Sequence, residues 1–360
     1  MKRQTLALLI GAFTLVAGVV VAKVAGLRLW DESPSAAAPE QKQEQKHDWR
    51  AGEYRLSGPR THENLTVFLI HGTPGTAGER FLTLEEAMAR KVVIVHETEE
   101  VNELAVENVS RTEEVFIQAG DIVKGGQQDR MLAVDLIVPA RSGRVPVDAF
   151  CVEHGRWAAR GGETMSAFTI SEQMASTKEL KMAAKQSRSQ AEVWARVDEA
   201  QSKLSASTNA DVRAAASASS YQLSLENDKV RESADEYIKA LSGVVEGKQD
   251  VLGFAFAVNG RVSSADVYAS PALFRRLWPK LLKASAVEAL AEMATADKLA
   301  PPTADAFAEL LADAGRGRVE AREVTRRTRM IKREGERAVF FETRDMQSGG
   351  AWFHRNYLAK

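Results

Sequence analysis

Short apolar segments, separated by charged or Gly/Pro-rich residues, dominate residues 64–169. They are LTVFLI, KVVIVHE, EVFIQAGDIV, MLAVDLIV and VPVDAFCVE, and they are rich in Val, Ile and Phe. Such short runs bounded by turn-forming residues are typical of β-strands. FLTLEEAMAR, which lies between the first two, has the apolar spacing of a short helix. The pattern therefore predicts a β-rich region at residues 64–169.

Residues 171–242 differ from the preceding region in amino-acid composition. The stretch 171–241 contains neither proline nor glycine, and Ala, Gln, Glu, Lys and Arg dominate it. This composition predicts helices, with a break near Asn209 in STNAD. Because large aliphatic residues are few, we expect a helical layer with much exposed surface.

Residues 243–360 mix both patterns. VLGFAFAVNGRVSSADVYAS predicts a hairpin with Asn259-Gly260 as its two-residue turn. A helix is expected from Pro271 to about Ala296, and Pro279 would kink it or split it in two. Strand patterns return at residues 334–345 and in the final AWFHRNYL. Strands and helices without regular βαβ alternation predict an α+β fold.

The N-terminus predicts export or membrane attachment. Lys2 and Arg3 precede an apolar run at residues 5–22, which Lys23 ends. The run approaches the length that spans a bilayer, and a cleaved signal peptide and a buried core helix are the alternatives. Residues 31–60, rich in Ala, Pro, Glu, Gln and Lys, predict a disordered tether.

The predicted organisation therefore has three parts. Residues 1–30 form a transmembrane anchor or signal segment, residues 31–60 the tether, and residues 61–360 a single α+β domain. We expect this domain to lie outside the cytoplasm, attached through residues 5–22, or to be secreted or periplasmic if the segment is cleaved.

Composition and charge exclude several classes of function. The net charge of −1 over 360 residues lacks the excess of basic residues that is typical of nucleic-acid-binding proteins. The single cysteine, Cys151, permits no disulfide within the chain. The six histidines show no metal-ligand spacing, so neither a metal nor a cofactor is expected. FLIHGTPG resembles the oxyanion loop of a hydrolase, but no GxSxG follows anywhere.

The first candidate site is GDIVKGGQQDR at residues 120–130. Gly125 and Gly126 allow positive φ angles and close approach of a ligand to the backbone. Arg130 offers a planar fork for phosphate or carboxylate, and Gln127 and Gln128 both donate and accept hydrogen bonds. The alternative is a polar hairpin in which Asp129 caps the turn or pairs with Arg130.

The second candidate is CVEHGRW at residues 151–157. Glu153 is suited to act as a general acid or base, Arg156 to pair with Glu153 or a ligand, and Trp157 to stack on a ring. The apolar surroundings of Cys151 indicate a buried, inert thiol. Structural roles for the whole cluster are the alternative.

These two motifs, with FLTLEEAM, VNELAVENVS, SQAEVWARV, GFAFAVNGRVSSADVYAS and AWFHRNYL, resemble the first ADP-ribosylglycohydrolase-and-rhodanese-phosphatase-superfamily-associated domain family of bacteria. The resemblance covers residues 64–358 and implies a link to ADP-ribose and NAD metabolism. Lys often follows the glycine pair in this family, and Asn often precedes the Arg, where this chain has Gln127 and Asp129. The site residues that the resemblance implies are Asn108, Gly125, Gly126, Gln128, Asp129, Arg130, Glu153, Arg156 and Trp157.

Two functions remain open from the sequence. In the first, both motifs form one site that binds a small polar ligand, possible candidates being nucleotides or ADP-ribose relatives, with Glu153 as acid or base if the site is catalytic. In the second, the chain is a non-enzymatic cell-envelope module that binds a protein partner through residues 171–242. The same polar residues then form a structural network.

Overall fold

The computed structural model describes residues 49–51, 53–75, 80–98, 100–156, 160, 163, 167–293 and 300–360. Helices make up 32% and strands 37%, arranged in several sheets, which confirms the predicted α+β class.

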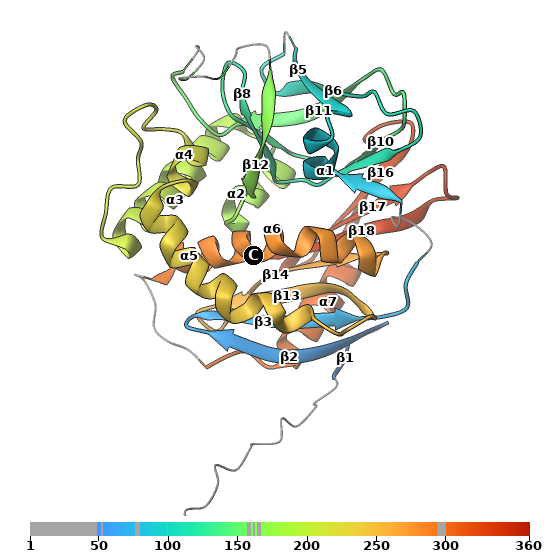
Figure 1. Ribbon diagram of the computed structural model, residues 1–360. Coiled ribbons are helices and arrows are strands. Elements are labelled where there is room, and N and C mark those ends of the chain that lie inside the picture. Colours follow the sequence, from blue (N-terminus) through green and yellow to red (C-terminus); the bar gives the residue numbers. More distant parts are fainter. Residues whose placement is uncertain are drawn as a thin grey trace, which may run out of the picture. The chain divides into compact units, whose positions relative to one another are not determined.

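The largest sheet is antiparallel throughout and has nine strands in the order β1-β2-β3-β13-β14-β18-β17-β16-β15 (Figure 1). Its strands are β1 (Trp49–Ala51), β2 (Tyr54–His62), β3 (Leu65–His71), β13 (Val251–Val258), β14 (Arg261–Tyr268), β15 (Arg318–Glu323), β16 (Thr328–Glu334), β17 (Ala338–Asp345) and β18 (Ala351–Ala359). The predicted hairpin is confirmed as β13–β14, and its turn residues Asn259 and Gly260 have φ angles of 51° and 73°. Two consecutive positive φ angles match the twist of a tight antiparallel hairpin.

Strand β13 is apolar along its whole length because both faces of the sheet are covered. Phe254 and Phe256 belong to the core on one face, whereas Ala255 and Ala257 belong to the core on the other. Successive side chains of a strand point to opposite faces, so a strand covered on both sides loses the usual alternation of polar and apolar residues.

The β-rich region contains a six-stranded sheet, β12-β8-β9-β11-β6-β5, and a three-stranded sheet, β10-β7-β4. Their strands are β4 (Phe81–Thr83), β5 (Val93–Glu97), β6 (Glu103–Asn108), β7 (Glu114–Ile117), β8 (Asp121–Gly125), β9 (Arg130–Leu132), β10 (Leu136–Val138), β11 (Arg144–Cys151) and β12 (Phe168–Met174). Every predicted segment contains a strand. EVFIQAGDIV and MLAVDLIV each divide into two strands that belong to different sheets, which ties the two sheets together.

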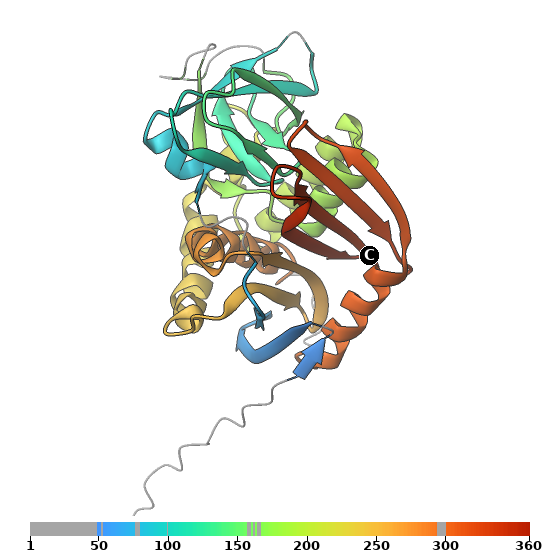
Figure 2. The same ribbon diagram turned by 90° about the vertical axis from the view of Figure 1, so that its right-hand side faces the viewer.

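The helices cover both faces of the nine-stranded sheet (Figure 2). They are α1 (Leu84–Ala89), α2 (Lys178–Met182), α3 (Gln190–Thr208), α4 (Tyr221–Leu225), α5 (Asp228–Leu241), α6 (Pro271–Ala291) and α7 (Ala304–Arg316), with a π-helical turn at Ala183–Ser187 and a 3-10 turn at Ser242–Val245. Helix α6 packs on β13 and also contacts β12 and β4 of the β-rich region. Helix α7 packs on the opposite face, where the rings of Phe307 and Phe68 lie 4.8 Å apart.

Several element boundaries in the structure differ from the predicted ones. The predicted tether ends at residue 60, but β2 already begins at Tyr54, and the predicted start of the helical region at residue 171 falls inside β12. Helix α6 is continuous through Pro279, so the chain is not split there. Helix α7 and strand β15 lie where the sequence pattern gave no assignment.

The anchor predicted at residues 5–22 lies outside the described residues. Within the described ranges, no helix is both long enough and apolar enough to cross a membrane.

Candidate functional site

The two sequence motifs lie side by side in the six-stranded sheet. Strand β9 pairs with β11 so that Arg130 faces Cys151, and the Val152 amide donates to the Asp129 carbonyl oxygen at 3.0 Å. The predicted meeting of GDIVKGGQQDR and CVEHGRW therefore follows from strand pairing, and Asp129 comes to lie beside Glu153.

The turn after β8 requires both of its glycines. Gly125 and Gly126 have φ angles of 112° and 55°, which side chains other than glycine rarely adopt. A Cβ on Gly125 would lie 2.7 Å from the Ala167 carbonyl oxygen, and one on Gly126 would collide with the Phe168 ring. The pair is thus explained by tight packing within the protein.

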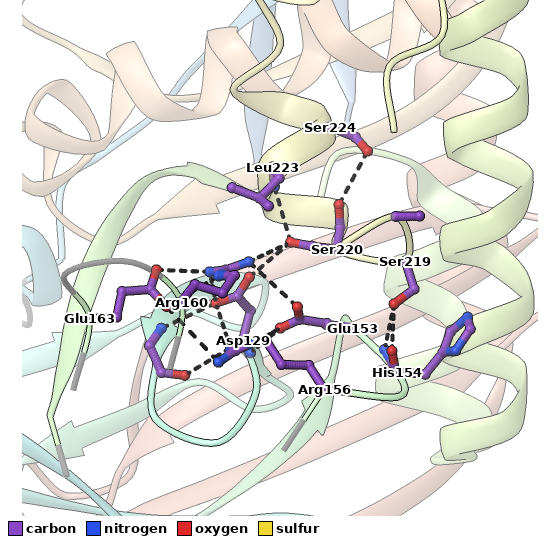
Figure 3. A network of polar contacts seen from close by, with 12 residues as sticks. Asp129, Glu153, His154, Arg156, Arg160, Glu163, Ser219, Ser220, Leu223 and Ser224 are labelled. Atoms are coloured by element: carbon purple, nitrogen blue, oxygen red, sulfur yellow. Dashed lines mark hydrogen bonds and ion pairs between the residues drawn. The ribbon is translucent and has the colours of Figure 1, made fainter. Parts of the chain in front are cut away.

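The Asp129 carboxylate is fully buried and joins three separate segments (Figure 3). It accepts hydrogen bonds from the Gly125 amide at 3.1 Å, from Ser220 Oγ at 3.0 Å and from Arg160 Nη2 at 2.7 Å. Ser220 is the N-cap of α4, so one carboxylate fastens the glycine turn, the segment around Arg160 and the start of a helix.

The Glu153 carboxylate is also fully buried and holds the second arginine. Its Oε2 accepts from the Asp129 amide at 3.2 Å and from Arg156 Nε at 2.8 Å, and its Oε1 lies 3.5 Å from Arg160 Nη1. Arg156 also donates to the carbonyl oxygens of Gly125 and Gly126, each at 3.4 Å. Glu153 therefore fixes the direction of the Arg156 guanidinium.

The network joins three carboxylates, of Asp129, Glu153 and Glu163, to the two guanidiniums of Arg156 and Arg160. Arg160 also binds Glu163, at 2.9 Å and 3.1 Å. Burial disfavours the Arg160 cation, but the Glu163 hydrogen bonds and the charges of Asp129 and Glu153 outweigh it and raise the pKa of Arg160. Burial raises the pKa of Asp129, with the charge of Arg160 acting against it. Isolated buried charges are costly, so each carboxylate here depends on its arginine partners.

The other predicted site residues take different positions. Arg130 has other partners than Glu153: it contacts the Val101 carbonyl oxygen, Cys151 Sγ at 2.8 Å and Glu97 Oε2 at 3.3 Å. Burial raises the pKa of the Cys151 thiol despite the nearby Arg130 charge, in agreement with an inert thiol. Trp157 lies outside the described residues.

Two buried amides complete the set of predicted residues. Asn108 donates to the carbonyl oxygens of Glu113 and Val138 and accepts from the Ser110 amide, which anchors a loop apart from the network. Gln128 is 1% exposed, and neither of its amide atoms has a hydrogen-bond partner among the described residues. Among the described residues, both polar side-chain atoms of Gln128 thus lack a partner, whereas Arg130 and Glu153 each leave one atom, Nε and Oε1, without a hydrogen bond.

Beside the network lies an open concavity of about 850 Å³, lined by His154, Gly155, Arg156, Asp198, Arg213 and Ala216, Ser217, Ala218 and Ser219. The Ser219 hydroxyl donates to the His154 carbonyl at 2.6 Å and accepts from the His154 amide at 3.1 Å, so the two walls are joined. The His154 ring stands edge-on to Trp194, with centroids 5.8 Å apart. Arg156 connects the buried network to this concavity.

Sequence reasoning missed Arg160, Ser220 and Arg213. Ser220 carried the only local signal, a serine just before the apolar YQLSL, which is typical of an N-cap. The partners of Asp129 lie 31 and 91 positions away along the chain, a separation that no local pattern reveals. Metal ligation has no support in the described ranges, where no group of three or more His, Cys, Asp or Glu side chains is placed to hold an ion.

The fold and the network define a single α+β module, with a buried charged cluster beneath an open polar concavity. Residues 53–358 match the ARG and Rhodanese-Phosphatase-superfamily-associated Protein domain, ARPP-1. The chain belongs to this family, as its motifs predicted. A comparison with curated proteins and one with solved structures each found no similar chain.

Proposed function

We propose that this ARPP-1 domain binds a small polar ligand with an anionic group in the concavity of His154, Arg156, Arg213 and Ser219. The observation that carries the proposal is the convergence of two segments. CVEHGRW supplies His154 and Arg156, and the loop before α4 supplies Arg213 and Ser219 to the same hollow. The family's association with ADP-ribosylglycohydrolases favours nucleotide or ADP-ribose relatives as the ligand class.

The lining suits such a ligand chemically. Arg213 donates to Ser202 Oγ at 3.2 Å, and a guanidinium has further donors for a phosphate or carboxylate. The His154 side chain is 47% exposed, so its ring offers a flat surface against which a base can pack. Arg156 is held by Glu153 and the glycine carbonyls, and a guanidinium fixed in advance loses less entropy on binding.

The geometry supports ligand binding better than catalysis. Glu153 is fully buried beneath Arg156, with both carboxylate oxygens facing arginines or the Asp129 amide. In this proposal Glu153 positions Arg156 and does not touch the ligand. The alternative is a scaffold in which the network only fastens the chain, and its support is that ion pairs link all five of its charged side chains.

Calorimetry and thermal shift on the purified chain can separate these functions. ADP-ribose, AMP and inorganic phosphate would each be titrated into the wild type, Arg213→Ala and Arg231→Ala. Arg231 lies on α5 with a 58% exposed side chain and is absent from the lining, so it is a matched control. A ligand at about 100 times its dissociation constant adds roughly 2.7 kcal/mol of stability.

The proposal expects a shift with ADP-ribose or AMP in the wild type and in Arg231→Ala, and its loss in Arg213→Ala. Equal responses of both variants to every compound, or no response of the wild type to any, would reject the concavity as the site and favour the scaffold. Export or membrane attachment through residues 5–22 stays a separate prediction.

A further inference from the structure

A second buried polar cluster lies where β18 and β14 meet the π-helical turn Ala183–Ser187. His354 stands between two carboxylates, with Nδ1 2.7 Å from Asp135 Oδ2 and Nε2 3.1 Å from Asp266 Oδ1. Lys185, in the π-helical turn, reaches the edge of this cluster. π-helical turns are rare in proteins overall, but those that occur are often found at functional sites.

Lys185 is half-buried, and its environment differs from that of the buried Lys280. The Lys280 ammonium forms an ion pair with Asp121 at 2.7 Å. Lys185 Nζ instead donates to the amide oxygen of Asn356 at 2.8 Å and lies 4.3 Å from the centroid of the Phe341 ring. Burial lowers the pKa of Lys185, although Asp135 and Asp266 act against it. Its amine is therefore more often neutral at physiological pH than that of an exposed lysine.

Lys185 lines two separate spaces. On the inner side is a cavity of about 20 Å³, whose lining includes Asp266, His354 and Asn356. On the outer side is a pocket of about 330 Å³, and Ala184 and Lys185 line both. The inner cavity has room for about one water molecule. The outer pocket has room for a small organic molecule.

The outer pocket is rich in cations. Arg188, Arg322 and Lys332 line it together with Lys185, against the two carboxylates of Asp148 and Glu320. Asp148 is shared between Arg188 and Arg322, at 2.9 Å and 2.7 Å, so a single carboxylate serves two guanidiniums. This excess of positive charge suits an anionic ligand.

We propose that Lys185 forms an imine with a small aldehyde or ketone whose phosphate or carboxylate binds the cations of this pocket. The neutral Nζ adds its electron pair to the carbonyl carbon, and a proton passes from nitrogen to oxygen to give a carbinolamine. Loss of one water then leaves the C=N bond. Amine and carbonyl compound are converted to imine and water, so no oxidant or reductant is required.

Reductive trapping in the unmodified full chain tests the proposal without depending on a variant that folds. The chain would be incubated with pyridoxal 5′-phosphate, pyridoxal or glyoxylate, reduced with borohydride and mapped by peptide mass spectrometry. Lys229 and Lys239, whose side chains are 61% and 72% exposed, are internal controls in the same sample. Each unit of pKa depression increases the neutral fraction about tenfold.

We expect pyridoxal 5′-phosphate to label Lys185 faster than either control lysine. Pyridoxal, which lacks the phosphate, should lose this preference, and glyoxylate shows whether a carboxylate substitutes for it. Arg322→Gln should reduce the rate at Lys185 and leave Lys229 unchanged. Labelling of Lys185 no faster than the controls, or equal preference with pyridoxal, would overturn the proposal. The readout does not involve the concavity of Arg213, so the two proposals fail independently.

Discussion

The ion pairs of His354 predict a loss of stability at alkaline pH. His354 is 1% exposed, lies between Asp135 and Asp266, and stacks on Tyr268 with ring centroids 4.5 Å apart. Burial opposes its protonation, but the charge and hydrogen bond of Asp135, followed by those of Asp266, outweigh burial and raise its pKa from 6.5 to about 9. The folded state therefore keeps a proton that the unfolded chain releases.

The sign and size of the effect follow from this shift. A histidine with a raised folded-state pKa contributes stability that is complete below pH 6.5 and is lost as the pH rises through about 9. At roughly 1.4 kcal/mol for each pH unit, the contribution is about 3 kcal/mol. The His354 charge holds the pKa of Asp135 below its ordinary value despite burial, so Asp135 stays ionised throughout this pH range.

Urea unfolding of the wild type and His354→Gln, at pH 6.5 and pH 10, isolates this contribution. At pH 6.5 the variant leaves two buried carboxylates without their shared cation, and we expect it to be less stable by about 3–5 kcal/mol. At pH 10 the wild-type imidazole is neutral as well, so the difference should shrink by about 3 kcal/mol. Groups that lie apart from this cluster titrate alike in both proteins and cancel in the comparison. A difference that stayed constant within about 1 kcal/mol would refute a protonated His354.

Three further substitutions probe other buried groups. Burial raises the pKa of Glu288 to about 7 from 4.5, so Glu288→Gln should stabilise the fold by up to about 3 kcal/mol above pH 7 and be neutral below pH 4.5, measured by urea unfolding at both. Asp129→Ala leaves Arg160 without its closest partner and should cost about 3–5 kcal/mol in the same assay. Its control, Asp198→Ala, removes a 55% exposed carboxylate and should cost under about 1 kcal/mol. Gly126→Ala forces a side chain at positive φ into Phe168 and should cost about 2–4 kcal/mol, read as a lower melting temperature.

Local pattern predicted the hairpin of β13 and β14 because its two strands and its turn lie within one short segment. VLGFAFAVNGRVSSADVYAS contains both strands of a hairpin and an Asn-Gly turn, and these forces act within twenty residues. The order of the nine-stranded sheet has a different origin, since β3 pairs with β13 and β14 with β18 across long stretches of chain. Such pairing depends on which apolar faces bury each other, and a single sequence does not display it.

The candidate site was likewise only partly predictable from the sequence. Strand signals placed Asp129 and Glu153 on neighbouring strands, and β9 does pair with β11. Side-chain direction could not be inferred, because Arg130 turns toward Glu97 and Cys151 instead of Glu153. A guanidinium adopts the direction in which buried acceptors are available, and those acceptors come from other strands.

In the proposed binding site, the residues that hold the site differ from those that would contact the ligand. Asp129 and Glu153 are fully buried, so their charges act on the protein itself, by fastening the glycine turn and Arg156. His154 and Arg213 are instead partly exposed at the concavity and come from different segments. Substitution of a buried carboxylate would therefore alter stability first and binding second, whereas substitution of Arg213 would alter binding alone. The lysine that is missing after the glycine pair, replaced here by Gln127, bears little on ligand affinity in this arrangement. The cations that line the concavity are Arg156 and Arg213, and Arg213 lies outside both motifs.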